Sequence, residues 1–124
     1  MNLTVLTTLL AFTAAASVAP PVDGDSLTEL KQIVHESNQC LLNEVSRRVD
    51  EKRTNIGSEE VSAIRMAAAN ACYRYNEQLA KFSKPYLDGS KSLKEATDEM
   101  LVGSIGIANA YIATRVKLNA ANAR

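Results

Sequence analysis

The sequence predicts an all-α protein, an up-down-up antiparallel three-helix bundle held together by one disulfide. The helices are expected at about residues 26–53, 58–84 and 92–118. Apolar residues recur at the helical period and do not alternate as in strands. Capping-box patterns beginning at Ser26 and Ser92 mark two helix starts. Because the connections between the long helices are short, neighbouring helices should run antiparallel.

The first 19 residues are expected to be a secretory signal peptide. Residues 3–16 form an apolar run without charge, shorter than the roughly 20 residues of a membrane span. Small residues place the cleavage after Ala16 or Ala19. The alternative is a buried helix of the mature fold, which the following proline pair disfavours by cutting the run off. The expected product is secreted and extracellular, with residues 20–25 as a linker and no integral membrane span.

The remaining composition describes one small domain, with a helical part at 26–118 and a frayed end at 119–124. Acidic and basic residues balance at 14 each in the 124-residue chain, so no charge excess indicates nucleic acid as a partner. The basic residues near Arg48 and Arg53 are interleaved with acidic ones, which favours helical salt pairs over a polyanion site.

The first predicted helix begins at Ser26 and fades near Arg53. Basic side chains crowd its last turns, where cations favour the negative end of a helix. Asn55 and Gly57 then supply residues that tolerate a turn. Its inward stripe, close to a 3.6-residue period, is Leu27, Leu30, Val34, Leu41, Val45 and Val49.

The second predicted helix begins at Ser58, with two glutamates in its first turn, and stops before Pro85. Its expected inward face is Val61, Ile64, Ala68, Ala71, Cys72, Tyr75, Leu79 and Phe82. The third helix opens at Ser92 and runs to about Leu118. It carries two apolar stripes, one of Leu93, Ala96, Met100, Ile107, Tyr111 and Leu118, and one of Leu101, Ile105, Ala108, Ile112 and Val116.

Cys40 and Cys72 are the two cysteines of the chain, and they lie at equal distances along the sequence from Ile56. Folding the chain at that turn would bring the two sulfurs to the same height on neighbouring antiparallel helices. Exported domains with two cysteines usually pair them. The sequence therefore predicts a Cys40–Cys72 disulfide, the alternatives being two buried free thiols or an intermolecular bridge.

The third predicted helix holds an apolar stretch at 100–114 without any charged residue. Two partner helices should not cover a segment that is apolar nearly all round, so part of it forms a candidate contact surface. That surface is expected at Met100, Leu101, Gly103, Ile105, Ile107 and Ile112. Ordinary packing is the alternative, since the remaining side of the helix carries mostly small residues. Gly103 and Gly106 indicate close packing or a bend, with room for a ligand as the weaker interpretation.

These features predict non-catalytic binding. The leading hypothesis is protein–protein interaction or self-association through the apolar third helix, with an unknown protein partner or a homo-oligomer. The alternative is an extracellular carrier that holds a small hydrophobic ligand or lipid within the bundle. We expect no enzymatic activity, no catalytic residues, no cofactor and no metal, because His35 is the single histidine and no ligand cluster accompanies it.

Overall fold

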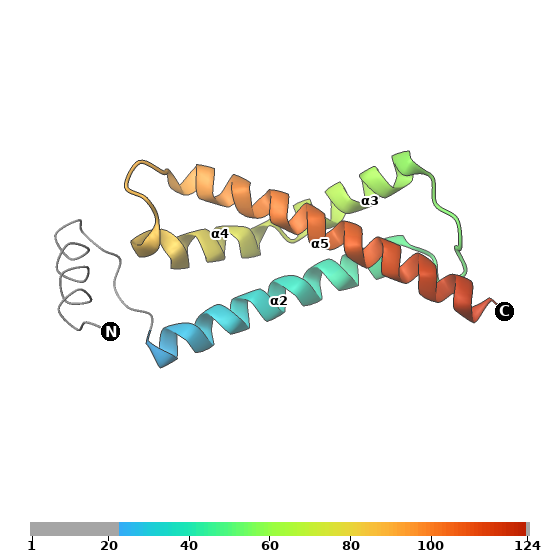
Figure 1. The fold of residues 1–124 in the computed structure, drawn as a ribbon, viewed down its shortest axis with the longest axis horizontal. Helices are drawn as coiled ribbons and strands as arrows, with labels where there is room; N and C mark the ends of the chain where they lie inside the picture. The colour runs from blue at the N-terminus through green and yellow to red at the C-terminus, as the bar shows by residue number, and fades with distance from the viewer. Residues whose placement is uncertain (1–22, 124) are drawn as a thin grey trace, which may run out of the picture.

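The computed structural model describes residues 23–123, which form only helices, turns and connections (Figure 1). The described part of the chain contains four α-helices: Gly24–Arg48 (α2), Ser58–Ala71 (α3), Tyr73–Ser83 (α4) and Leu93–Asn122 (α5). A short 3₁₀ helix, Lys84–Tyr86 (η1), lies between α4 and α5. The predicted signal peptide and both of its cleavage sites lie outside the described residues.

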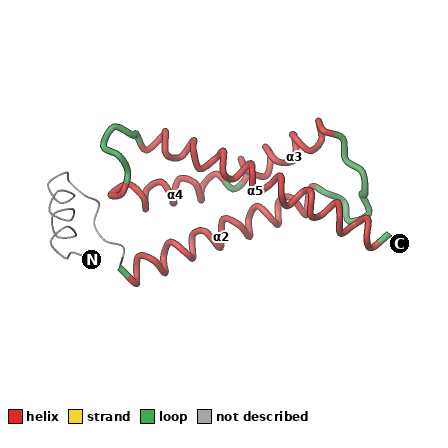
Figure 2. The backbone as a smooth tube through the Cα atoms, viewed as in Figure 1, coloured by secondary structure: helices red, strands yellow, loops and turns green. Residues whose placement is uncertain are grey.

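The predicted three-helix bundle is wrong, because the structure is a bundle of four helices. The continuous helix expected at 58–84 is divided at Cys72 into α3 and α4. α4 contacts α2, α3 and α5, and so counts as an element of the bundle in its own right. Figure 2 shows α3 and α4 as separate helical segments joined by a short non-helical link.

The break at Cys72 keeps the buried residues of α3 and α4 on the same side of the helical segment. Cys72 has φ −101° and ψ 12°, outside the helical region. Five of the six buried positions of α3, the link and α4, all except Ala69, follow each other at intervals of four: Ile64, Ala68, Cys72, Asn76 and Ala80. At about 100° per residue, an uninterrupted helix would rotate the last of these roughly 160° away from the first. The interruption lets all five face the interior. The fully buried residues after Cys72 are therefore Asn76 and Ala80, whereas the predicted Tyr75 and Leu79 are half-buried, Tyr75 against the core.

The ends of α2 also differ from the prediction. Asp23 caps the helix in place of Ser26, since the Ser26 N–H donates to Asp23 Oδ1 at 2.6 Å. The helix ends at Arg48, earlier than the expected Arg53, because Val49 is extended and buried. The Asp50 carboxylate then accepts a hydrogen bond from the Lys52 N–H, which favours a turn over further helix.

α5 begins as predicted and ends later than predicted. Ser92 is its N-cap, and the Ser92 hydroxyl accepts a hydrogen bond from the Glu95 N–H at 3.1 Å. The helix continues to Asn122, beyond the expected end at Leu118, so residues 119–122 are helical. Asn119 anchors this end, because its buried Nδ2 donates to the carbonyl oxygens of Asp50 and Arg53 at 2.9 and 2.8 Å.

The predicted disulfide between Cys40 and Cys72 is confirmed. It joins the middle of α2 to the link between α3 and α4, with Cα atoms 5.9 Å apart. α5 lies against α2, α3 and α4 and crosses them along the long axis of the molecule (Figure 1). The disulfide therefore fixes the spacing of two helices that α5 also contacts.

Candidate binding groove

The apolar core fills only one part of the bundle. Its buried residues are Leu41, Val45, Val49, Ile64, Ala68, Cys72, Ala108 and Ile112. In α2 and α3 these residues lie on the side of the disulfide that leads to the α2–α3 turn. On the other side of the disulfide, the next buried positions of α2, α4 and α5 are Ser37, Asn76 and Ser104. Small polar side chains thus replace the large apolar ones where the core ends.

An open groove of about 260 Å³ lies at this polar layer, between α2, α4 and α5. Its nine lining residues are Val34, Ser37, Asn38, Asn76, Leu79, Met100, Gly103, Ser104 and Ile107. None of the nine is charged. Val34 and Ile107 are exposed and Leu79 and Met100 are half-buried, so apolar side chains form much of the wall. Ligand pockets share this combination of apolar walls with a few convergent polar groups.

Asn76 is the most unusual group of the groove wall. The residue is 1 % exposed, and its Oδ1 accepts a hydrogen bond from the Ser104 hydroxyl at 2.9 Å. Within the described residues, the Asn76 Nδ2 is buried and has no hydrogen-bond partner. Buried polar groups are almost always paired, and an unpaired donor costs about 1–3 kcal/mol. One residue of the groove wall therefore carries a buried donor whose partner is not supplied by the described part of the chain.

The structure separates the six residues of the expected contact surface. Met100, Gly103 and Ile107 line the groove together. Ile112 is 2 % exposed and belongs to the core, whereas Leu101 and Ile105 are half-buried and lie outside the groove lining. The apolar stretch of α5 is thus shared between the core and the groove and does not form one continuous external face.

The two central glycines of α5 do not serve close packing. A Cβ atom added at Gly103 or Gly106 would have no atom within 4 Å apart from its own chain neighbours and the helix backbone. The expectation of a close backbone approach is therefore wrong for both positions. Gly103 instead widens the groove, while Gly106 is exposed outside the groove lining.

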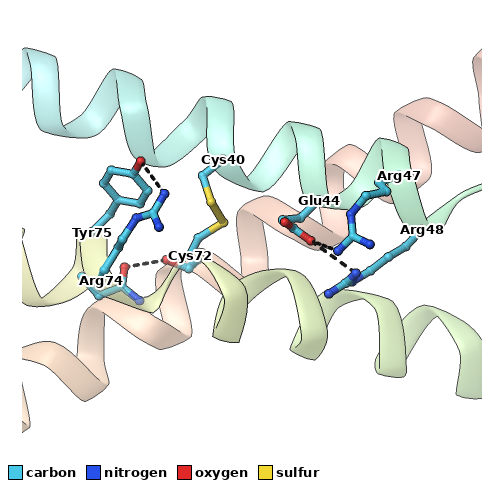
Figure 3. The surroundings of a disulfide bond; sticks show 9 residues. Cys40, Glu44, Arg47, Arg48, Cys72, Arg74 and Tyr75 are labelled. Carbon is cyan, nitrogen blue, oxygen red and sulfur yellow. Dashed lines mark hydrogen bonds and ion pairs between the residues drawn. A yellow bond between two sulfur atoms is a disulfide. The ribbon is translucent and has the colours of Figure 1, made fainter.

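Charged side chains flank the disulfide (Figure 3). The Glu44 carboxylate pairs with Arg47 at 2.7 Å and with Arg48 at 3.2 Å. On the other side, the Arg74 guanidinium lies 4.9 Å from the centre of the Tyr75 ring, close enough for a cation–π contact. These pairs agree with the interpretation that the basic residues of α2 form helical salt pairs.

A larger depression of about 580 Å³ lies at the other end of the bundle and has a different character. It is lined by Glu51, Lys52, Arg115, Asn119, Asn122 and Ala123. The Arg115 guanidinium pairs with Glu51 at 3.0 Å, and Asn119 is used to hold the α2–α3 turn. Arg115 Nε is also buried without a partner among the described residues. We favour the groove as the candidate site because its walls are uncharged and largely apolar, whereas charged and polar side chains line most of this depression.

None of the described helices has the length and hydropathy needed to cross a membrane. The chain matches no protein-family model, and comparisons with curated proteins and with solved structures found no match. The candidate site therefore stands on its own geometry. Sequence reasoning missed Asn76, Ser104 and Ser37, because polar residues on an amphipathic helix are assigned to the solvent face unless the phase of the helix is known.

Proposed function

We propose that this protein is a non-catalytic binding protein that holds a small, uncharged and largely apolar molecule in the groove between α2, α4 and α5. The observation that carries the proposal is that Asn76, on the wall of a groove with apolar sides, has a buried Nδ2 without a hydrogen-bond partner among the described residues. Pockets for small molecules usually combine such walls with a few placed polar groups. The uncharged lining favours a neutral ligand, because an ionised group would lose its hydration without gaining a partner.

The size of the groove limits the ligand. Its 260 Å³ lie just below the usual range of about 300–1,000 Å³ for ligand pockets. A water molecule takes about 30 Å³ in the liquid, so the groove matches roughly nine non-hydrogen atoms. We therefore favour a compact hydrocarbon of about this size over a long lipid chain.

The small number of exposed apolar side chains on α5 outside the groove favours this proposal over self-association through the third helix. Of the α5 residues outside the groove, Val102 is the most exposed large apolar side chain at 69 %. Its neighbours on the same face, Gly106 one turn on and Asn109 two turns on, offer little apolar area. A specific protein interface normally buries about 800 Å² on each partner and has an apolar centre.

We further propose that the protein acts outside the cytosol. Disulfides persist in oxidising compartments and are rare in the reducing cytosol. The Cys40–Cys72 bond supports an exported protein, in keeping with the signal peptide expected from the sequence.

Two glycine variants of α5 test the binding proposal. Gly103→Leu places a side chain in the groove, whereas Gly106→Leu adds the same side chain to the same helix outside the groove lining. The probe is isopropylbenzene, titrated into the oxidised protein and followed by NMR of the side-chain methyl groups. We expect saturable binding to the wild type, at least a tenfold loss in Gly103→Leu and a change within about twofold in Gly106→Leu.

Both variants should remain folded, because each replaces a helical glycine with a better helix former. The proposal is refuted if isopropylbenzene does not bind the wild type, or if the two variants bind it equally. Native mass spectrometry of the same samples reports the oligomeric state. A stable dimer that Gly106→Leu abolishes and Gly103→Leu does not would favour the self-association hypothesis instead.

A further inference from the structure

We propose that the ligand of the groove carries a hydrogen-bond acceptor, such as a carbonyl oxygen, and that the Asn76 amide recognises it through Nδ2. This inference rests on the proposed function and specifies the chemical class of the ligand. The ligand would be a compact hydrocarbon with one neutral acceptor, as in a small ketone or ester.

The position of Ser104 decides which end of the Asn76 amide is left for a ligand. The Ser104 hydroxyl donates its proton to Asn76 Oδ1 across the interface between α5 and α4. With the Ser104 hydroxyl bonded to Oδ1, the NH₂ group of Asn76 has no hydrogen-bond partner within the described residues. The complementary ligand group must therefore accept a hydrogen bond. A ligand group that only donates would leave Nδ2 without a partner, even if it bonded to the second lone pair of Oδ1.

The burial of Nδ2 raises the question of access. Nδ2 is covered from solvent, so a ligand reaches it by displacing a side chain of the groove wall. Met100 is suited to this movement, because methionine is unbranched, has several rotatable bonds and fills irregular gaps. Leu79, also half-buried, lines the wall on α4 close to Asn76 in sequence. The apolar part of the ligand would replace these contacts while its acceptor pairs with the amide.

A matched pair of probes tests the acceptor. Acetophenone and isopropylbenzene have nearly the same size and shape, and they differ in having a carbonyl oxygen or a methyl group. Each is titrated into the oxidised wild-type protein and into Asn76→Leu, which keeps the branching and the number of side-chain heavy atoms and removes the amide. We expect Asn76→Leu to weaken acetophenone about tenfold and to leave isopropylbenzene unchanged or tighter.

The two proposals fail in different ways. Absence of binding by both probes to the wild type would refute the groove as a binding site. If both probes bind and Asn76→Leu affects them equally, the groove remains a binding site, and the proposal that Asn76 recognises an acceptor is refuted. Equal affinities of acetophenone for the wild type and for a folded Asn76→Leu would refute it as well.

A second measurement on the wild type avoids dependence on the variant. The Asn76 side-chain ¹⁵NH₂ group gives two resolved proton signals, and a new hydrogen bond to a carbonyl moves one of them downfield. We expect that shift with acetophenone and not with isopropylbenzene. Identical spectra with the two probes would mean that Nδ2 pairs with water or with nothing, and would overturn the assignment.

Discussion

Removal of the Cys40–Cys72 cross-link should lower the stability of the protein by a large and calculable amount. The bond closes a loop with a sequence separation of 32. The chain-entropy relation gives about 3.7 kcal/mol at 25 °C for a loop of this length. Unfolding entropies of about 2.1 cal/mol/K per residue give roughly 0.2 kcal/mol/K for about 100 residues. The expected fall in Tm is therefore about 15–20 °C.

Two forms of the protein separate the cross-link from the packing of its sulfur atoms. The reduced wild type keeps both sulfurs, whereas Cys40→Ser/Cys72→Ala also removes a sulfur from a site that is 1 % exposed. Thermal unfolding is followed by circular dichroism at 222 nm. The reduced protein should lose the full 15–20 °C, and the double variant somewhat more. A Tm within about 5 °C of the oxidised protein in both forms would refute the reasoning.

The remaining predictions concern the two ends of the bundle. Asn119→Ala should cost about 1–3 kcal/mol in urea unfolding, because it leaves two turn carbonyls without a donor, whereas the exposed Asn122→Ala should be nearly neutral. The pKa of Asp23 is lowered from 3.8, chiefly by the hydrogen bond from the Ser26 backbone N–H. Asp23 therefore stabilises the fold above pH 3.8, and this contribution is lost as the pH falls through the lower folded-state pKa. Asp23→Asn keeps the cap and should show a shallower loss in unfolding midpoint between about pH 5 and pH 2.5; an unchanged pH profile would contradict this.

The sequence predicted those features that local chemistry determines. Ser92 caps α5 because its hydroxyl and the residue three positions on fit one motif. The Cys40–Cys72 pairing followed from their equal spacing about a turn, and the structure confirms it. Each of these predictions needs only residues within a few turns, or two residues whose relation a single turn fixes.

The division at Cys72 could not be predicted in the same way. No proline or glycine marks it, and good helix formers, Ala71 and Arg74, lie on both sides of it. The break arises because the buried positions recur every four residues, and this pattern becomes visible only when burial is known. A uniform helical period assigned Tyr75 and Leu79 to the interior, one position before Asn76 and Ala80.

The groove could not be predicted from the sequence for the same reason. A one-residue shift in phase turns Asn76 from a surface residue into a buried one, and only then does it meet Ser104 from a segment 28 residues away. The uncharged stretch at 100–114 of α5 did indicate a segment that packing against the other helices does not fully cover. The three residues that line the groove, Met100, Gly103 and Ile107, come from that stretch.

The disulfide and the groove are also connected by geometry. Ser37 lies three residues before Cys40, and Asn76 lies four residues after Cys72, so each polar wall residue is one helical turn from a cysteine. The groove lining contains no large apolar side chain that is fully buried and could hold α2 and α4 at a fixed distance. The covalent bond one turn away supplies that spacing, while the core beyond it is complete without the groove residues. On the proposed function, a ligand would enter and displace wall side chains without disturbing the packed part of the bundle, whereas reduction of the disulfide should loosen the walls before the core.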